Sequence, residues 1–497
     1  MIRPQKTQYY LEFKQGSIYL HYELYNKKHF LKFNSFSKLI NYLFVQEKKI
    51  ICYTNDFNII NTYCCKNYHH LYKKQLIGDT KLIGFSIGNL VIRDMKYYFG
   101  TDRINDIDYN LAVIKNTHFK SWKAGYTSLI GKNICAEKIR EMPELPYSIS
   151  YAMIHHSSLG AVIYSVKNKD FENAYCYDRK SAYPAILCQP VPYSFKRVDR
   201  YKPQTNKIHW GKITIKNLKA KDINFLPLYR GKKYDKEKVY VLGKRILAAT
   251  EYSYYGYIEH ELELLSYAYT YDEIKISYVY EVTFSCLPQE TINAIIELFN
   301  YKENNKNGKN YAGVKQMLNR IYGYFLTVIP NGKDSFRLRD KKIPYSIGTW
   351  VTSKQRIEML KMFKKIGKEN IIAGHTDSII ATKNCDEIVE KINEEINIYK
   401  KMGHWIGEAA YKKICYFSNV TAKYIDNQGE LKMKHGGISD LDMDLFLKNT
   451  SYDEINEYSP IWVTRGMQFK QTNKGFIKIH IKEKMTLVKT EKEEFKC

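Results

Sequence analysis

The segment from residue 370 to residue 382 constrains the fold of this chain more than any other. It reads NIIAGHTDSIIAT, which is an apolar run, a short polar stretch and a second apolar run. This pattern predicts a buried β-hairpin whose polar tip stays exposed. Asp377 lies at that tip, where a carboxylate is held firmly and stays accessible, as a metal ligand must be. The alternative is plain turn chemistry, because Asp and Ser favour turns for local reasons.

A second carboxylate ends a strand-like run upstream. Residues 172–178, ENAYCYD, predict a strand that ends on Asp178, and residues 181–187, SAYPAIL, predict the helix that follows. At the lip of a sheet, this carboxylate is placed where a metal ion can bind. Pro184 favours an extended or turned backbone at Tyr183. The alternative is that Asp178 only caps the following helix.

A helix with a polar stripe is predicted between the two carboxylates. In residues 312–325, AGVKQMLNRIYGYF, the side chains of Lys315, Asn319 and Tyr322 recur at i, i+4 and i+7. Lysine can meet phosphate, asparagine can hydrogen-bond, and tyrosine offers a flat ring to a base. Gly323 would let another group approach the backbone closely. The alternative is an ordinary solvated helix face.

The remaining chain between the carboxylates adds strands and helices. Residues 207–285 contain alternating β-like runs around one helical piece at 260–269, and residues 290–300 and 347–367 predict helices. Two-metal phosphoryl transfer needs two carboxylates on neighbouring strands, and a cationic helix can hold a triphosphate. A strand carboxylate, a lysine-bearing helix and a hairpin carboxylate, in this order, are what a polymerase palm interrupted by fingers requires.

The charge of the chain points to a polyanionic partner. Lys and Arg total 78 against 52 Asp and Glu, which gives a formal net charge of +26. Nucleic acid is the first candidate, because phosphate neutralisation dominates its binding. The 45 tyrosines could stack on bases, although the codon bias of an AT-rich genome is the alternative explanation for them. No apolar run approaches the roughly 18 residues of a transmembrane helix, so we expect no membrane partner.

The 10 cysteines indicate a reducing compartment. None forms a CxxC pair, and their scatter predicts free thiols in the cytoplasm. One Cys/His cluster, Cys64, Cys65, His69 and His70, lacks a second ligand pair at zinc-finger spacing. We therefore expect no metal there.

At these residues the sequence resembles the family B DNA polymerases, most closely their protein-primed branch from phages and linear plasmids. Residues 178–184 look like that family's DxxSLYP motif, with Ala182 in place of Leu. Residues 315–323 look like its KxxxNSxYG motif, with Arg320 in place of Ser. The similarity covers roughly residues 160–497.

Two further motifs match with departures. Residues 373–378 look like YxDTDS, but His375 replaces the first Asp. That acid is auxiliary in the family, so catalysis should survive, and the metal preference is left open. Downstream lies a segment similar to the one that leads through a KxY motif. There the Lys position falls on Ala422, Lys423 is one residue later, and Tyr424 matches.

The resemblance implies a role for each matching residue. Asp178 and Asp377 would be catalytic and bind two Mg²⁺ ions, for which Mn²⁺ can substitute. Tyr183 would lie beneath the deoxyribose, where its ring leaves no room for a 2′-hydroxyl. The residues expected to contact the incoming nucleotide are Tyr183, Lys302, Lys315, Asn319 and Tyr322. The residues expected to contact primer–template are Ser181, Gly323, Thr376, Ser378, Lys423 and Tyr424.

The resemblance also implies an α+β fold, a right-hand polymerase preceded by a degenerate exonuclease-like domain. We expect the N-terminal domain at residues 1–165 and the polymerase domain at 166–497. The expected subdomains of the latter are the palm at 166–206 and 340–440, a β-rich insertion at 207–290, the fingers at 291–330 and the thumb at 441–497.

The N-terminal part departs from an active exonuclease. The family pattern has DxE, then NxxxFD, then YxxxD. Glu12 and Lys14 stand at the first motif, Asp56 and Asn58 at the second, and the third has no match. Hydrolysis at two metals needs clustered carboxylates, so we expect no 3′→5′ degradation. An unrelated N-terminal domain is the alternative.

These inferences combine into one expected function. The chain is expected to be a monomeric, cytoplasmic, template-directed DNA polymerase that adds dNTPs to the 3′-hydroxyl of primer–template DNA. It would serve phage or plasmid genome replication, in the bacterial host cytoplasm if a phage encodes it. Priming by DNA, RNA or the hydroxyl of a terminal protein stays open. The alternatives are a primer-making or template-independent nucleotidyltransferase and a catalytically silent DNA-binding relative. A silent site would have no need to retain all four of Asp178, Asp377, Lys315 and Tyr183.

Overall fold

The computed structural model of the chain forms two compact units. The first comprises Met1–Lys132, Tyr301–Gln316 and Trp462–Lys484, and the second comprises Asn133–Asn300, Met317–Ile461 and Met485–Cys497. The structure describes residues 8–14, 17–24, 27–44, 50–54, 60, 72–77, 82–87, 90–94, 134, 136–143, 145–156, 160–229, 239–242, 245–306, 311–330, 336–338, 342–396, 401–435, 438, 440–472 and 475–487. The residues singled out above that lie outside these ranges are Asp56, Asn58, Cys64, Cys65, His69 and His70.

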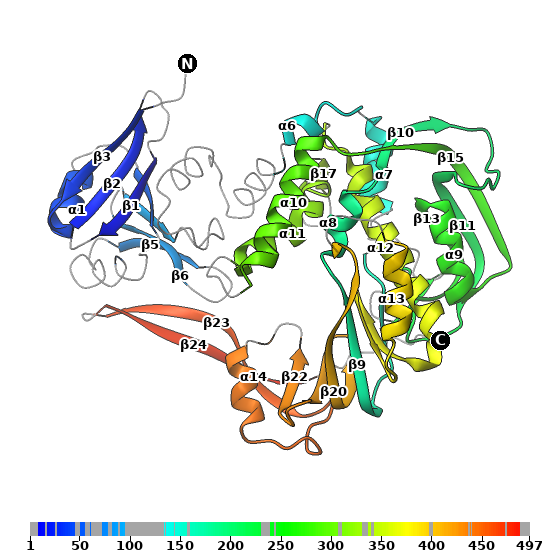
Figure 1. Ribbon diagram of the computed structural model, residues 1–497. Helices are drawn as coiled ribbons and strands as arrows, with labels where there is room; N and C mark the ends of the chain where they lie inside the picture. The colour runs from blue at the N-terminus through cyan, green and yellow to red at the C-terminus, as the bar shows by residue number, and fades with distance from the viewer. Residues whose placement is uncertain are drawn as a thin grey trace. The chain divides into compact units, whose positions relative to one another are not determined.

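The first unit contains a mixed sheet with the strand order β3-β2-β1-β4-β7-β6-β5 (Figure 1). Its strands are β1 (Gln8–Lys14), β2 (Ser17–Leu24), β3 (Lys27–Phe33), β4 (Ile50–Thr54), β5 (Tyr72–Ile77), β6 (Leu82–Ile87) and β7 (Leu90–Asp94). The first three strands are antiparallel, whereas β4 runs parallel to β1 and β7 runs parallel to β4. Helix α1 (Phe36–Phe44) packs on β3, where the ring centroids of Phe33 and Tyr42 are 5.5 Å apart.

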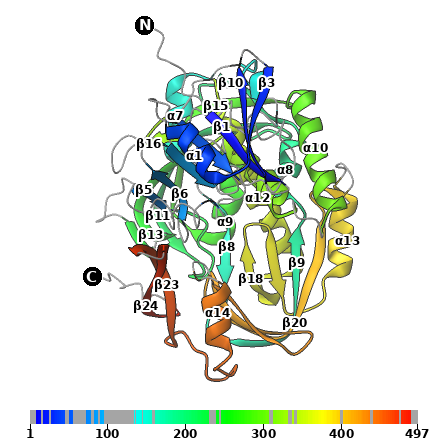
Figure 2. The same cartoon turned by 90° about the vertical axis from the view of Figure 1, so that its left-hand side faces the viewer.

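The second unit contains a seven-stranded sheet, which we call the site sheet, with the order β22-β21-β20-β9-β19-β18-β8. Its strands are β8 (Ile163–Ser165), β9 (Asp170–Arg179), β18 (Ile371–His375), β19 (Ser378–Ala381), β20 (Trp405–Ser418), β21 (Thr421–Asp426) and β22 (Leu431–His435). Figure 2 shows β9 beside β20 and β18 near them. The predicted hairpin, the predicted strand that carries Asp178 and the α+β class are confirmed.

A second sheet of this unit, the β11 sheet, has the order β10-β15-β11-β13-β12, with β14 paired to β11. Its strands are β10 (Val191–Arg197), β11 (Ile208–Ala220), β12 (Val239–Leu242), β13 (Arg245–Tyr257), β14 (Tyr269–Thr270) and β15 (Glu273–Ser285). The sequence pattern did not reveal β13. Its tyrosines lie on both faces of the strand, since Tyr252 and Tyr254 are buried and Tyr255 on the other face is half-buried. The alternation of apolar and polar residues that predicts a strand is therefore not visible in its sequence.

The structure also describes further helices in the chain. They are α6 (Ala136–Ile139), α7 (Tyr147–His156), α8 (Ala182–Leu187), α9 (Ile258–Ala268), α10 (Gln289–Asn304), α11 (Tyr311–Tyr324), α12 (Tyr345–Ile366), α13 (Asp386–Glu394) and α14 (Asp440–Leu447). The short pairs β16 (Val328–Pro330) with β17 (Phe336–Leu338), and β23 (Pro460–Thr472) with β24 (Gly475–Thr486), complete the described elements. None of the described helices is long and apolar enough to cross a membrane.

Helix α12 joins the two sheets of the second unit into one core. It contacts β18 of the site sheet and β10 and β13 of the β11 sheet, so it is buried nearly all round. A Cβ atom at Gly374 would lie 2.7 Å from Cζ of Phe363. Glycine at this position therefore lets α12 approach β18 closely. The strand that leads to Asp377 is thus pressed directly against the most buried helix.

Candidate active site

The structure brings the two predicted carboxylates to the same end of two neighbouring strands, Asp178 on β9 and Asp377 in the turn directly before β19. Asp178 in β9 lies opposite Ser378 of β19 in the antiparallel register. Asp377 precedes Ser378, and its backbone carbonyl accepts a 2.7 Å hydrogen bond from the amide of Arg179. Both aspartates are half-buried. Asp178 belongs to a strand, and the N-cap of α8 is Ser181, so the helix-capping alternative for Asp178 is wrong.

The hairpin tip is held in an unusual backbone conformation. Thr376 has φ +57°, which is strained for a β-branched residue and costs roughly 1–3 kcal/mol. Its amide donates to the carbonyl of Val162 at 3.1 Å, and its carbonyl accepts from Nε2 of Gln355 at 3.0 Å. The hydroxyl of Ser378 donates to the carbonyl of His375 at 3.3 Å, so ordinary turn chemistry is present as well. These bonds fix the backbone on which Asp377 is carried.

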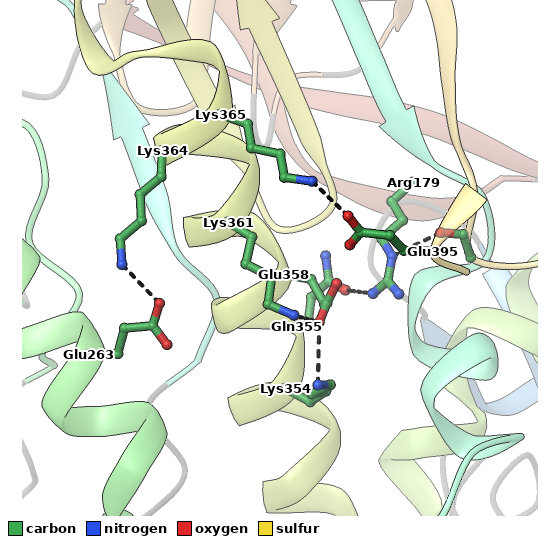
Figure 3. Close-up of polar contacts among 10 residues, drawn as sticks. Arg179, Glu263, Lys354, Gln355, Glu358, Lys361, Lys364, Lys365 and Glu395 are labelled. Carbon is green, nitrogen blue, oxygen red and sulfur yellow. Dashed lines mark hydrogen bonds and ion pairs between the residues drawn. The ribbon is translucent and has the colours of Figure 1, made fainter. Parts of the chain in front are cut away.

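A buried arginine, which the sequence analysis did not single out, ties this tip to the end of β9. The Nε atom of Arg179 donates to the carbonyl of Gly403 at 3.0 Å, and its Nη1 atom donates to Oε1 of Gln355 at 2.6 Å. Gln355 in turn donates to Thr376. Figure 3 shows Arg179 and Gln355 pointing toward each other beside α12. The backbones on either side of the two carboxylates are therefore connected through one buried chain of hydrogen bonds.

The charge of Arg179 is balanced by acids on both sides. Its side chain is only 2% exposed, and burial lowers its pKa while the carboxylates of Glu358 and Asp377 oppose that shift. Burial alone would raise the pKa of Glu358, but Arg179, Lys354 and Lys361 together hold it below its ordinary value. Figure 3 shows both lysines beside Glu358. The Nζ atoms of Lys354 and Lys361 lie 3.4 Å and 3.3 Å from its Oε1 atom. An uncompensated buried cation next to Asp377 is thereby avoided.

Two tyrosines lie beside Asp377. The ring centroids of Tyr183 in α8 and Tyr322 in α11 are 4.2 Å apart, with the rings tilted by 57°. Burial raises the pKa of both phenols, and the negative charge of Asp377 raises each further. Both tyrosines are therefore neutral at physiological pH and within electrostatic reach of the carboxylate. The two rings, predicted from motifs about 140 positions apart, form a single aromatic pair.

The predicted stripe on α11 lies on a real helix. Asn319 is exposed, one position before the exposed Arg320. A Cβ atom at Gly323 would meet nothing within 4 Å, so no described group of the protein requires glycine there. Lys315 and Lys302 belong to the first unit. The ammonium of Lys315 lies 6.0 Å from the ring of Tyr311, whereas Lys302 is nearly buried and ion-paired with Glu303 at 3.2 Å.

One face of the site sheet carries Asp178, Cys176 and His375. The ring of His375 stacks on Tyr416 with centroids 5.6 Å apart, and its buried Nε2 atom has no hydrogen-bond partner among the described residues. Burial and the nearby charge of Lys434 lower the pKa of His375 to about 4. His375 is therefore neutral near pH 7 and does not supply the negative charge of the acid that it replaces.

Lys423 is placed differently from the expectation. It points away from the face that carries Asp178 and Tyr424, because neighbouring residues of a strand face opposite sides. Its buried ammonium donates to the carbonyls of Tyr452 and Ile455 at 2.8 and 3.0 Å. Tyr424 lies with Ala422 on the other face and packs edge-on against Tyr411 at 4.9 Å. Lys423 is thus a link to the C-terminal segment, and its primer contact stays a prediction.

The sequence analysis also missed two charged residues on the Asp178 face. Lys434 of β22 is the cross-strand partner of Ala422, and its charge opposes the rise to about 11 that burial causes in the pKa of Cys176. Glu408 accepts from the thiol of Cys176 at 3.8 Å. Lys434 therefore supplies a cation beside the position where the KxY pattern lacks its lysine. Only the strand register could reveal this, because Lys434 lies outside the motif on the next strand, β22.

The carboxylate oxygens of the site suit a hard cation that is bound partly by the protein and partly by the substrate. Among the described residues, no group of three or more His, Cys, Asp or Glu side chains could hold a metal ion. The available donors are the carboxylates of Asp178 and Asp377. Mg²⁺ at nucleotide sites is commonly held by one or two carboxylates, water and substrate phosphates rather than by a closed protein cage. The two aspartates fit that arrangement.

Comparison with known proteins finds the same fold. No protein family and no curated protein matches the sequence. The structure is similar to Phi29 DNA polymerase complexed with primer-template DNA and incoming nucleotide substrates, with a TM-score of 0.61 and 13% identity over 97% of this chain and 100% of that chain. It is also similar to Phi29 DNA polymerase complexed with single-stranded DNA, with a TM-score of 0.58 and 14% identity over the same shares. At these identities the likeness shows a shared fold over nearly the whole chain.

Proposed function

We propose that the chain is a template-directed DNA polymerase, similar to the protein-primed family B branch, that adds dNTPs to a 3′-hydroxyl by two-metal phosphoryl transfer. The observation that carries the proposal is the placement of Asp178 on β9 and of Asp377 in the turn directly before the paired strand β19, beside the Tyr183–Tyr322 ring pair. The fold shared with Phi29 DNA polymerase supports it. The subdomain boundaries, a monomeric state, a cytoplasmic location and a role in phage or plasmid replication are parts of the same proposal.

Each residue of the site would have its own role in the reaction. Asp178 and Asp377 would hold two Mg²⁺ or Mn²⁺ ions, which when bound offset the negative charge that develops on the transferring phosphoryl group. The ring of Tyr183, packed against Tyr322, would form the floor beneath the sugar. Lys315 would meet the triphosphate, and Lys434 would neutralise backbone phosphate of the primer strand. Arg179 and Gln355 would keep the two strand ends in register.

Primer extension tests the proposal directly. We expect incorporation that follows the template when the protein receives a primed DNA template, dNTPs and Mg²⁺. Addition without a template, or synthesis without any primer, would instead indicate the nucleotidyltransferase alternative. Absence of incorporation with DNA, RNA and hydroxyl-bearing protein primers would indicate a silent DNA-binding relative. Adding each primer class separately also identifies the priming mode.

Tyr183→Ala is expected to admit ribonucleotides. Removing the ring opens the space beneath the sugar, so a 2′-hydroxyl no longer clashes. The measurement is the ratio of dNTP to rNTP incorporation, which we expect to fall by at least about tenfold, or roughly 1.4 kcal/mol of discrimination. Tyr183→Phe is the matched control, since it keeps the ring and should keep the ratio. An unchanged ratio in Tyr183→Ala would remove the proposed steric role.

We further propose that the first unit lacks 3′→5′ nuclease activity. Glu12, the acid at the first expected exonuclease motif, is held by His21, whose Nε2 atom lies 3.0 Å from its Oε2 atom. A carboxylate only accepts, so His21 donates this bond. End-labelled single strands incubated with Mg²⁺ or Mn²⁺ and no dNTPs should stay intact. A degradation ladder that persists in Asp377→Asn and vanishes in Glu12→Ala would contradict this proposal.

A further inference from the structure

A lysine of the second unit lies in the turn between Asp178 and Tyr183. Lys180 occupies the second open position of the DxxSLYP-like motif, where the family pattern requires no particular residue. The turn follows β9, and Ser181, with φ +48°, is the N-cap of α8. The Lys180 side chain therefore starts between the proposed metal ligand and the ring proposed to lie beneath the sugar.

The backbone of this turn is held by the residues that precede β20. The amide of Lys180 donates to the carbonyl of His404 at 2.8 Å, and the carbonyl of Lys180 accepts from the amide of Gly403 at 2.7 Å. The Nε atom of Arg179 donates to the carbonyl of Gly403 at 3.0 Å. Gly403 has φ +82°, a conformation that glycine adopts readily. The starting point of the Lys180 side chain is thus fixed by hydrogen bonds.

The side chain of Lys180 leads to α10. Its Nζ atom lies 5.5 Å from the ring centroid of Phe299, a ring that is only 1% exposed and so is fixed by the core. An aromatic ring at this distance attracts a cation and leaves its positive charge in place. The guanidinium of Arg179 instead contacts Gln355 of α12. The two neighbouring cations therefore lie against different helices.

The lysines that the sequence analysis assigned to the nucleotide are placed differently. Lys302 is 7% exposed and its ammonium lies 3.2 Å from the carboxylate of Glu303. A phosphate that bound Lys302 would compete with this buried ion pair. Lys302 and Lys315 belong to the first unit, whereas Lys180 belongs to the second unit together with both site carboxylates. Lys180 is therefore a cation that the second unit itself supplies next to Asp178.

We infer that Lys180 binds the β- and γ-phosphates of the incoming dNTP. The inference rests on the proposed function, because it requires a nucleotide whose triphosphate is held by metal ions at Asp178. The Cα atoms of residues 178 and 180 are at most about 7 Å apart, so that triphosphate lies within reach of the lysine side chain. Lysine binds phosphate as a compact point charge, which suits a group with several equivalent oxygens.

The test measures nucleotide binding without turnover. The full-length protein receives Mg²⁺ and a primer–template whose primer ends in a dideoxynucleotide and whose next template base is thymine. A fluorescent dATP analogue is then displaced by unlabelled dATP or by dAMP, which lacks the β- and γ-phosphates. Lys180→Met should lower the affinity for dATP by at least about tenfold, as for one hydrogen bond to a charged group, and leave the affinity for dAMP unchanged.

Two control variants accompany this measurement. Lys180→Arg keeps a cation on a long side chain and should retain most of the affinity for dATP. Lys196→Met removes an exposed lysine from β10 and should leave both affinities unchanged. Methionine at position 180 keeps an apolar stem against Phe299, so the thermal unfolding midpoint of Lys180→Met should equal that of the wild type.

Equal affinity for dATP in Lys180→Met and the wild type would overturn the inference. Equal losses for dATP and dAMP would also overturn it, because Lys180 would then only hold the turn against α10. A loss of dATP affinity in Lys302→Met that Lys180→Met lacks would return the contact to Lys302. Extension of a primer with a 3′-hydroxyl by the wild type judges the proposed function separately. A wild type that extends this primer, with dATP affinity insensitive to residue 180, would contradict the inference alone. A wild type that neither extends it nor binds dATP would contradict both.

Discussion

Asp178→Asn and Asp377→Asn are each expected to reduce nucleotide incorporation by more than about 100-fold, equivalent to roughly 2.7 kcal/mol of transition-state stabilisation. Each change replaces an anionic donor with a neutral amide, a weaker ligand for a hard cation. Asp178 lies on β9 and Asp377 lies in the turn directly before the paired strand β19, and the described residues include no third acid clustered with them that could compensate. Single-turnover primer extension at saturating dNTP measures the effect.

The matched control for these variants is Asp272→Asn. Asp272 is exposed and accepts a 2.7 Å hydrogen bond from Asn217 on the β11 sheet, which an asparagine can still accept. It should leave incorporation unchanged. Affinity for primer–template should stay within about threefold in all three variants, because most of that affinity comes from phosphate contacts elsewhere. If either site variant kept more than about one hundredth of the wild-type rate, the two-carboxylate assignment would be wrong.

Glu261→Ala is expected to destabilise the second unit by about 3–5 kcal/mol, which is typical of removing one partner of a buried ion pair. Nη1 of Arg356 lies 2.8 Å from Oε1 of Glu261, with side chains 2% and 1% exposed. Arg356 also donates to the carbonyl of Pro227 at 3.2 Å, and Tyr254 donates to Glu261 at 3.2 Å. Truncation leaves a buried guanidinium without its counter-charge where α9 meets α12.

Urea denaturation followed by tryptophan fluorescence measures this loss. Trp350 is a suitable reporter, because it stacks on His260 beside Glu261 with ring centroids 4.9 Å apart. Glu273→Ala is the matched control, since its 2.6 Å ion pair with Lys216 is 54% exposed on both sides and screened by solvent. It should leave the midpoint unchanged. Equal midpoints for Glu261→Ala and Glu273→Ala would show that the buried pair contributes no more than the exposed one.

The local elements of the site could be predicted because their signals are local. The hairpin at 370–382 and the strand that ends near Asp178 follow from apolar runs and turn residues within a dozen positions. The stripe on α11 follows from helical periodicity. Strand β13 was missed because tyrosine suits both a buried and an exposed face, so its alternation carries no clear period.

Residue orientation could not be predicted where a motif departs from its pattern. A shift of one position places Lys423 on the opposite face of β21 from Tyr424, and its ammonium is bound by carbonyls of the C-terminal segment. A cation on the Asp178 face is instead supplied by Lys434, which reaches that position through its register with Ala422. The pairing of β21 with β22 decides which lysine lies on the Asp178 face, and a sequence motif does not show which strand will pair with it.

The sequence by itself determined the two carboxylates, the aromatic residues of the site and the elements that carry them. Only the tertiary structure decided what holds the carboxylates in place. Arg179 and Gln355 are 176 positions apart, yet they share a 2.6 Å hydrogen bond in the core. A charged residue at the end of a strand is ordinarily solvent-exposed, so nothing local marks Arg179 as buried. Its burial is stable only because Gln355 and Glu358 from α12 and Asp377 from the β18–β19 turn converge on it, and that convergence exists only once the chain has packed.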